Sequence, residues 1–152
     1  MDLENRRRVL MFNGVLVFLL GLLTGFFVDF GAFTNNRMGL AAHLEGILNG
    51  TFLIALGLLW SHVNLPSRAD AAARWLPVAG AYMNWTLAAF AATFGRGRTS
   101  PIHPADRPWF LGEMPLTEAA LLVLSVFFVV TCVLILWGLR RPVTPPHDAA
   151  TA

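Results

Sequence analysis

Three polar residues interrupt the second long apolar stretch of the chain: His43, Glu45 and Asn49. An ionisable side chain within a membrane span is energetically costly, so such residues usually face a bundle interior or a cavity and mark a site. An imidazole can bind a metal, a carboxyl group can move a proton, and an amide can orient a substrate by hydrogen bonding. The sequence therefore predicts a functional site around these three residues.

Helical periodicity divides this group. At about 100° per residue, with His43 set to zero, Glu45 lies at about 200° and Asn49 at about 240°, so these two share a stripe. Gly46 and Gly50 lie in the sector of the helix surface between that stripe and His43. Their spacing is the small-xxx-small pattern of helix packing, which is the favoured interpretation of the glycines taken alone. Contact with a cofactor is the alternative that His43 at the edge of the sector suggests.

Structural roles compete for the polar residues as well. His43 could hydrogen-bond a neighbouring helix, and Asn49 could join two helices. Glu45 could be protonated and paired with Asn84 or Tyr82 in the third apolar stretch. Two ionisable groups in one span favour function over these structural roles.

A single histidine in a span can supply one metal bond, whereas a protein-only zinc site usually needs three or four ligands. The other histidines fall at a helix end, in a loop and in the C-terminal tail: His62, His103 and His147. A haem brings its own equatorial ligands, needs only one axial imidazole and leaves its sixth position for a substrate. We therefore expect His43 to be a haem ligand. Arg37, about 9 Å earlier along a helix, is compatible with a propionate partner, or with a flanking role at the membrane surface.

The elements that position these residues are predicted to be membrane helices. The chain of 152 residues is 56% hydrophobic and only 13% charged, which is too apolar for an ordinary soluble domain. Uninterrupted apolar runs that lack the alternation of barrel strands predict helices. We expect an all-α integral membrane four-helix bundle over residues 1–141 and a disordered tail over 142–152, with the first helix retained rather than removed as a signal peptide. The spans are predicted at Val9–Val28, Met38–Trp60, Trp75–Phe94 and Leu116–Leu139.

Arginine placement predicts the orientation of these helices. Seven arginines flank the side that holds both termini and four lie on the other side, which predicts cytoplasmic termini. No basic stripe with interleaved aromatic residues indicates nucleic acid, so membrane lipid is the expected surrounding partner. Tryptophans near the ends of the spans are expected to be anchors at the membrane interface: Trp60, Trp109 and Trp137.

The run Asn36–Leu53 resembles the second-helix signature of the hydroxylaminobenzene mutases, a family of small four-helix bacterial membrane proteins. The similarity extends through Gly80–Trp85 and Leu136–Arg140. More distantly, Ala42-His43 followed by Leu48-Asn49-Gly50 resembles the corresponding helix of the styrene oxide isomerases. This resemblance implies a homotrimer in the bacterial inner membrane with haem b at its subunit interfaces.

The resemblance also implies roles for individual residues. His43 matches the axial histidine of the isomerases, and Asn49 matches their substrate-directed asparagine. Glu45 matches the mutases and departs from the isomerases. When Asn84 is aligned with an asparagine of the isomerases, their third-helix tyrosine falls at an alanine, so Tyr82 is a substitute from another turn. Asn36 and the Ala41-Ala42 pair also depart from the mutase pattern.

The activity implied is isomerisation of aryl hydroxylamines to ortho-aminophenols, a Bamberger-type rearrangement, with ferric haem b as the Lewis acid. In this hypothesis Asn49 orients the NHOH group and Glu45 moves a proton. Tyr82, Asn84 and Trp85 would form the wall around the aromatic ring. The alternatives are an epoxide isomerase that uses the same Lewis acidity, and a non-enzymatic b-type cytochrome or structural membrane protein.

Overall fold

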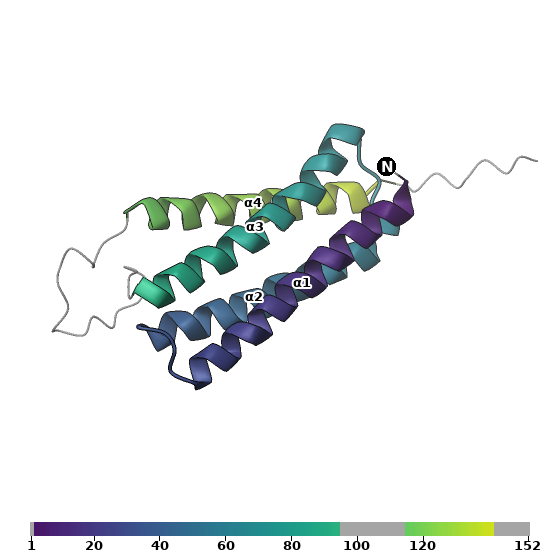
Figure 1. Cartoon of the computed structure of the whole chain (residues 1–152). Coiled ribbons are helices and arrows are strands. Elements are labelled where there is room, and N and C mark those ends of the chain that lie inside the picture. The colour runs from purple at the N-terminus through teal and green to yellow at the C-terminus, as the bar shows by residue number, and fades with distance from the viewer. Residues whose placement is uncertain (1, 95–114, 142–152) are drawn as a thin grey trace, which may run out of the picture.

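The computed structural model describes residues 2–94 and 115–141. Within these residues the chain forms four α-helices and one short 3-10 helix, and the all-α prediction is confirmed. In Figure 1, α1 runs beside α2, and α3 lies between that pair and α4. The predicted tail 142–152 lies outside the described residues, as do His103, Trp109 and His147. The elements are α1 (Leu3–Asp29), α2 (Asn36–Leu59), η1 (Trp60–His62), α3 (Ser67–Phe94) and α4 (Pro115–Leu139).

Three of the described helical segments are long and apolar enough to cross a membrane: Leu3–Asp29, Asn36–His62 and Ala119–Leu139. Their outer faces carry many exposed large apolar side chains, which suits contact with lipid. α3 is not among these segments, in contrast to the predicted third span. Its sequence is less apolar because charged residues occupy its first two turns and Tyr82 and Asn84 follow further along.

α1 and α2 form the most extensive helix pair and are joined by a short turn. Asp2 caps α1 by accepting the N–H of Asn5, and Asn35 caps α2 by accepting the N–H of Met38. The turn between them contains Gly31 with φ of +66°, a conformation that glycine adopts without steric cost. The backbone N–H of Asn35 donates to the carbonyl of Ala92, at 2.9 Å, so the start of α2 meets the end of α3.

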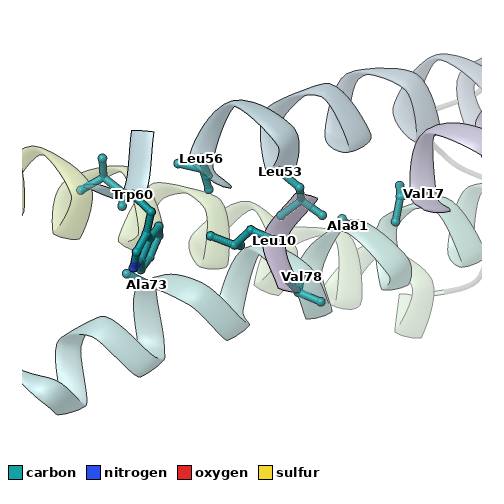
Figure 2. Packing of buried hydrophobic residues seen from close by; sticks show 9 residues of the cluster. Leu10, Val17, Leu53, Leu56, Trp60, Ala73, Val78 and Ala81 are labelled. Carbon is teal, nitrogen blue, oxygen red and sulfur yellow. The ribbon is translucent and has the colours of Figure 1, made fainter. Parts of the chain in front are cut away.

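The main core lies where α1, α2 and α3 meet. Figure 2 shows Leu10 of α1 between Leu53 of α2 and Val78 of α3, with Trp60 beside Ala73. A second, smaller cluster joins the other ends of α2 and α3 through small residues. It consists of Met38, Ala42, Ala88, Ala91 and Ala92.

A buried carboxylate holds one end of the helices together. Asp70 Oδ1 accepts from Arg6 Nη1 of α1 at 3.0 Å and from the indole Nε1 of Trp60 at 3.2 Å. Its Oδ2 accepts from Arg74 Nη2 at 3.1 Å. Asp70 and Arg74 are both buried, so this charge-assisted group connects α1, η1 and α3 away from solvent.

The predicted role of Trp60 as an interface anchor is wrong. Its side chain is 1% exposed and its N–H is satisfied by Asp70, so it is a core residue. Trp137 is partly exposed and lies under the guanidinium of Arg141, 5.0 Å from the ring centroid, as an amphipathic residue at a helix end can. The backbone N–H of Asn64 donates to the carbonyl of Gly138, which brings the end of α4 to the same end of the molecule as Asp70.

Substitution of Asp70 by Asn tests the buried charge group. The amide keeps an acceptor for Trp60 but leaves the buried Arg74 facing a neutral partner, so we expect the free energy of unfolding to fall by about 3 kcal/mol. Thermal unfolding in detergent, followed by circular dichroism, measures the change. Glu4→Gln is the control, because Glu4 makes only exposed ion pairs, and it should cost less than about 1 kcal/mol. Equal losses in the two variants would contradict a structural role for Asp70.

Candidate active site

His43 faces α1. Its Nδ1 lies 2.8 Å from the backbone carbonyl of Gly21, and its ring packs over Gly25. A carbonyl oxygen only accepts, so Nδ1 carries the proton and donates it to Gly21, which leaves the lone pair of Nε2 available. A neutral imidazole whose other nitrogen is held by a backbone acceptor is a common arrangement for a metal-binding histidine.

A hollow on the outside of the α1–α2 pair is lined in part by His43. Its other walls are largely apolar and exposed, as expected of a surface that a flat apolar group or another chain could cover. Asp29, at the end of α1, supplies a carboxylate at the rim. The lining residues are Leu22, Gly25, Phe26, Val28, Asp29, Leu40 and His43.

Gly46 and Gly50 are in contact with α1. A Cβ atom at Gly46 would lie 2.5 Å from the Cα of Gly21, and one at Gly50 would lie 2.6 Å from the backbone nitrogen of Phe18. Both are far below an ordinary contact, so the two helices touch backbone to backbone. Within one chain, α1 therefore occupies the space beside these glycines. This is the helix-packing role that their spacing favours.

Glu45 and Asn49 lie on a different side of α2. Helical periodicity places them on the stripe of Met38 and Ala42, the residues that pack against α3. Both side chains are half-buried. Glu45 Oε2 and Asn49 Nδ2 are buried yet have no hydrogen-bond partner among the described residues. Buried polar atoms without a partner are costly, so each such atom calls for a ligand or water.

Asn84 belongs to the same region. On α3 it shares a stripe with Ala88 and Ala91, which pack against Ala42, and the antiparallel register places it at the level of Glu45. The structure thus brings Glu45, Asn49 and Asn84 to one part of the α2–α3 contact. His43 lies apart from this group, since around α2 it is about 160° from Glu45 and about 120° from Asn49.

Tyr82 and Trp85 face α1. The Tyr82 hydroxyl donates to Asn13 Oδ1 at 2.9 Å, and Trp85 Nε1 donates to Thr24 Oγ1 at 3.0 Å. Tyr82 is therefore bonded to α1 and not to Glu45. Asn13 and Thr24 were missed by sequence reasoning, although each is a polar residue in the apolar run of the first helix and could have been found by that signal.

Arg37 is exposed in the first turn of α2, one turn before Leu40 of the hollow. Arg37 therefore lies on the same side of α2 as the hollow. Its side chain is long enough to reach a propionate of a haem bound in the hollow. No contact joins Arg37 to His43 directly.

The side chains around the hollow fit a haem. His43 lines a largely apolar hollow with its Nδ1 bonded to Gly21, and Arg37 lies one turn before Leu40 of that hollow. The described residues hold no group of three or more histidine, cysteine or acidic side chains that could bind a metal ion by themselves. A macrocycle that needs only one protein ligand is compatible with a lone imidazole.

Comparisons with known proteins identify the family of the chain. The sequence profile described as styrene oxide isomerase matches residues 6–140. The chain belongs to the styrene oxide isomerase family. It is 44% identical to the hydroxylaminobenzene mutase HabB of Ectopseudomonas oleovorans over 99% of this chain and 92% of that protein. It is 37% identical to the mutase HabA of the same organism over 84% of this chain and 95% of that protein. No solved structure matches.

The predicted resemblance to hydroxylaminobenzene mutases is confirmed by both relatives. The family and the two relatives are all named for isomerising enzymes, and this chain is an enzyme of the isomerase or mutase class. The match to the family covers all four helices and both faces of α2 described above.

Substitution of Gly46 by Ala tests the backbone contact between α1 and α2. The new methyl group meets the Gly21 backbone, which cannot move as a flexible side chain does, so we expect a loss of about 2 kcal/mol in the free energy of unfolding. Gly80→Ala is the control, because its methyl would meet only the Phe128 ring at 3.1 Å. Thermal unfolding of both variants in one detergent measures the difference. A Gly46 variant as stable as the control would mean that the helices do not pack as described.

Proposed function

We propose that the protein isomerises aryl hydroxylamines to ortho-aminophenols, the reaction for which its two relatives are named. The observation that carries the proposal is His43, whose Nδ1 is held by a backbone carbonyl and whose Nε2 is left for a ligand beside an apolar hollow. The unpartnered Glu45 and Asn49 supply polar groups suited to an NHOH substituent. The cofactor in this proposal is haem b.

His43 would hold the haem through Nε2, and Arg37 would pair with a propionate at the edge of the hollow. The ferric haem, when bound, supplies a Lewis-acidic centre that weakens the N–O bond. The reaction consumes no redox partner, because the oxygen that leaves nitrogen reappears on the ring. The apolar side chains around the hollow exclude water, which protects an electron-poor arene from stray nucleophiles.

Asn49 and Glu45 act on the substrate. The free Nδ2 of Asn49 donates a hydrogen bond that orients the NHOH group. The Glu45 carboxyl group moves a proton, either to the departing oxygen or from the ring carbon during rearomatisation. Asn84, at the same level on α3, extends this polar wall. Tyr82 acts less directly, since its hydroxyl is already donated to Asn13.

The two faces of α2 support an assembly of several chains. If His43 held the haem, the residues that touch the substrate would have to lie on a segment other than the one around His43. Around α2, Glu45 lies about 160° and Asn49 about 120° from His43, so one chain would not bring these side chains and His43 to the same haem. We therefore propose a homo-oligomer in which His43 of one chain and Glu45 of the next share a site. A trimer is the assembly implied by the resemblance.

The membrane setting of the proposal follows from the helices. The arginines near the start of α1, the start of α3 and the end of α4 gather at one end of the molecule, where Arg6 and Arg74 meet Asp70. This distribution supports a cytoplasmic location of that end in a bacterial inner membrane. α3, which carries Tyr82 and Asn84, completes a four-helix bundle with its polar side turned toward the other helices.

An epoxide isomerase is the second candidate, because the matching family bears the name of styrene oxide isomerase. The same Lewis acidity would act on a C–O bond. The two reactions are separated by offering phenylhydroxylamine and styrene oxide to the same preparation and measuring 2-aminophenol and phenylacetaldehyde.

Replacing His43 by Ala tests the cofactor. The purified wild-type protein should show a Soret band and convert phenylhydroxylamine to 2-aminophenol. The variant should lose both, because no other described histidine lies in the hollow. Absorption spectroscopy and product chromatography make the two measurements. A variant with an undiminished Soret band would remove His43 from the role of haem ligand.

Replacing Glu45 by Gln tests proton transfer. The amide is nearly the same size but cannot deliver the proton, so we expect kcat to fall by roughly 10²–10⁴ with the Soret band retained. Glu4→Gln, the same change at an exposed carboxylate near the start of α1, is the matched control and should leave turnover unchanged. Unchanged turnover in a haem-replete Glu45 variant would exclude the residue from proton transfer.

Mixed oligomers test the shared site. Subunits with His43→Ala and subunits with Glu45→Gln, carrying different tags, are co-expressed and isolated through both tags. If neighbouring chains share a site, some interfaces combine an intact His43 with an intact Glu45, and turnover should exceed that of either variant alone. If each chain uses its own pair, the mixed oligomers stay as inactive as the parents.

A further inference from the structure

The imidazole of His43 contacts the backbone of two glycines of α1, Gly21 and Gly25. The carbonyl of Gly21 accepts the Nδ1 proton at 2.8 Å. A Cβ at Gly25 would lie 2.7 Å from Nδ1 and 2.8 Å from Cε1 of the same ring. The ring is therefore held at one edge by a hydrogen bond and lies directly against the backbone where a side chain is missing.

Gly25 differs from four other glycines at which α1 and α2 approach each other. A methyl group at Gly14, Gly21, Gly46 or Gly50 would meet backbone atoms of the facing helix, and so would push the two helices apart. At Gly25 the three nearest atoms all belong to the His43 ring. The space at Gly25 thus serves the imidazole and not the approach of the helices.

The Gly21 carbonyl decides which ring nitrogen is free. A neutral imidazole has one N–H and one lone pair, and a carbonyl can only accept. A helical carbonyl has a second lone pair beside the one used within its own helix, so it can accept from the ring as well. Because Nδ1 is the donor, Nε2 keeps its lone pair and points away from Gly21.

We propose that Gly21 and Gly25 form a backbone seat for the His43 imidazole, in which the Gly21 carbonyl fixes the tautomer and Gly25 leaves the space that sets the orientation of the ring. Both are positioning residues that act through His43. The inference rests on the proposed function in one respect, that the group held by Nε2 is the haem iron. The seat itself is a property of the chain.

Small imidazoles test the hydrogen bond in a chain without the native ring. In His43→Gly, added imidazole and 4-methylimidazole can ligate haem through one nitrogen and donate the other N–H to Gly21. The isomer 1-methylimidazole has no N–H and places a methyl group at the carbonyl. We expect it to bind the haem-loaded variant about tenfold more weakly than 4-methylimidazole, as one lost hydrogen bond implies. Soret titrations measure the affinities, normalised to free haem in the same detergent. Equal normalised affinities would overturn the role of Gly21.

The substitution Gly25→Ala tests the space beside the ring. Alanine favours a helix over glycine, so α1 should keep its helical structure while the imidazole is displaced. In the ferrous protein we expect a shifted iron–histidine stretching frequency in the resonance Raman spectrum and haem retention reduced about tenfold. Gly80→Ala, which meets only the Phe128 ring in another helix pair, should leave both unchanged. A wild-type frequency and wild-type haem retention in the Gly25 variant would overturn its assignment.

A measurement without haem separates this inference from the proposed function. Full-length protein with ¹⁵N-labelled histidines is prepared under haem limitation, and the His43 signals are assigned by difference from His43→Ala. Shifts of an Nδ1-protonated ring support the seat, and those of an Nε2-protonated ring overturn it, whatever the cofactor is. A wild-type chain with the Nδ1-protonated ring that binds no haem would reject the haem proposal while leaving the seat intact.

Discussion

The close approach of α1 and α2 is the constraint on which the rest of the structure depends. With a Cβ at Gly46 the separation from the Gly21 Cα would be only 2.5 Å, so no larger residue is compatible with this contact. Between membrane helices the hydrophobic effect contributes little, and close packing of small residues becomes the main source of attraction. The same approach brings the Gly21 carbonyl within hydrogen-bond distance of His43. The orientation of the imidazole therefore depends on the same close packing that holds α1 and α2 together.

α2 carries its polar residues on two faces with different surroundings. His43 faces α1 and lines an outward-facing hollow. Glu45 and Asn49 lie on the side of α2 that packs against α3, and each has a buried polar atom with no hydrogen-bond partner among the described residues. A helix of one chain cannot turn both faces to the same ligand. This arrangement supports the proposed assembly, in which the outward-facing hollow of one chain would be covered by the next.

α3 is fixed by polar contacts in addition to its apolar core with α1 and α2. Tyr82 and Trp85 donate to Asn13 and Thr24 of α1, and Asp70 gathers two arginines and an indole at the end of the helices. Each of these bonds is strong where water is scarce, because an unpaired polar group there is costly. They hold α3 in register with α2, and so keep Asn84 at the level of Glu45. The less apolar helix is consequently the one that positions Asn84 in the proposed site.

The sequence by itself determined the helices, because their apolar runs are a local property that composition and length reveal. The predicted spans agree with α1, α2 and α4, and the residues that carry the resemblance indicate the family that the comparisons show. Periodicity also separated His43 from Glu45 and Asn49. Only the tertiary structure decided which neighbour each residue meets. Gly46 packs against the backbone of α1, Tyr82 hydrogen-bonds to Asn13, and the buried Trp60 hydrogen-bonds to Asp70. The positions of side chains around one helix follow from their spacing in the sequence. The register and depth of its contact with another helix depend on side chains far away in the sequence.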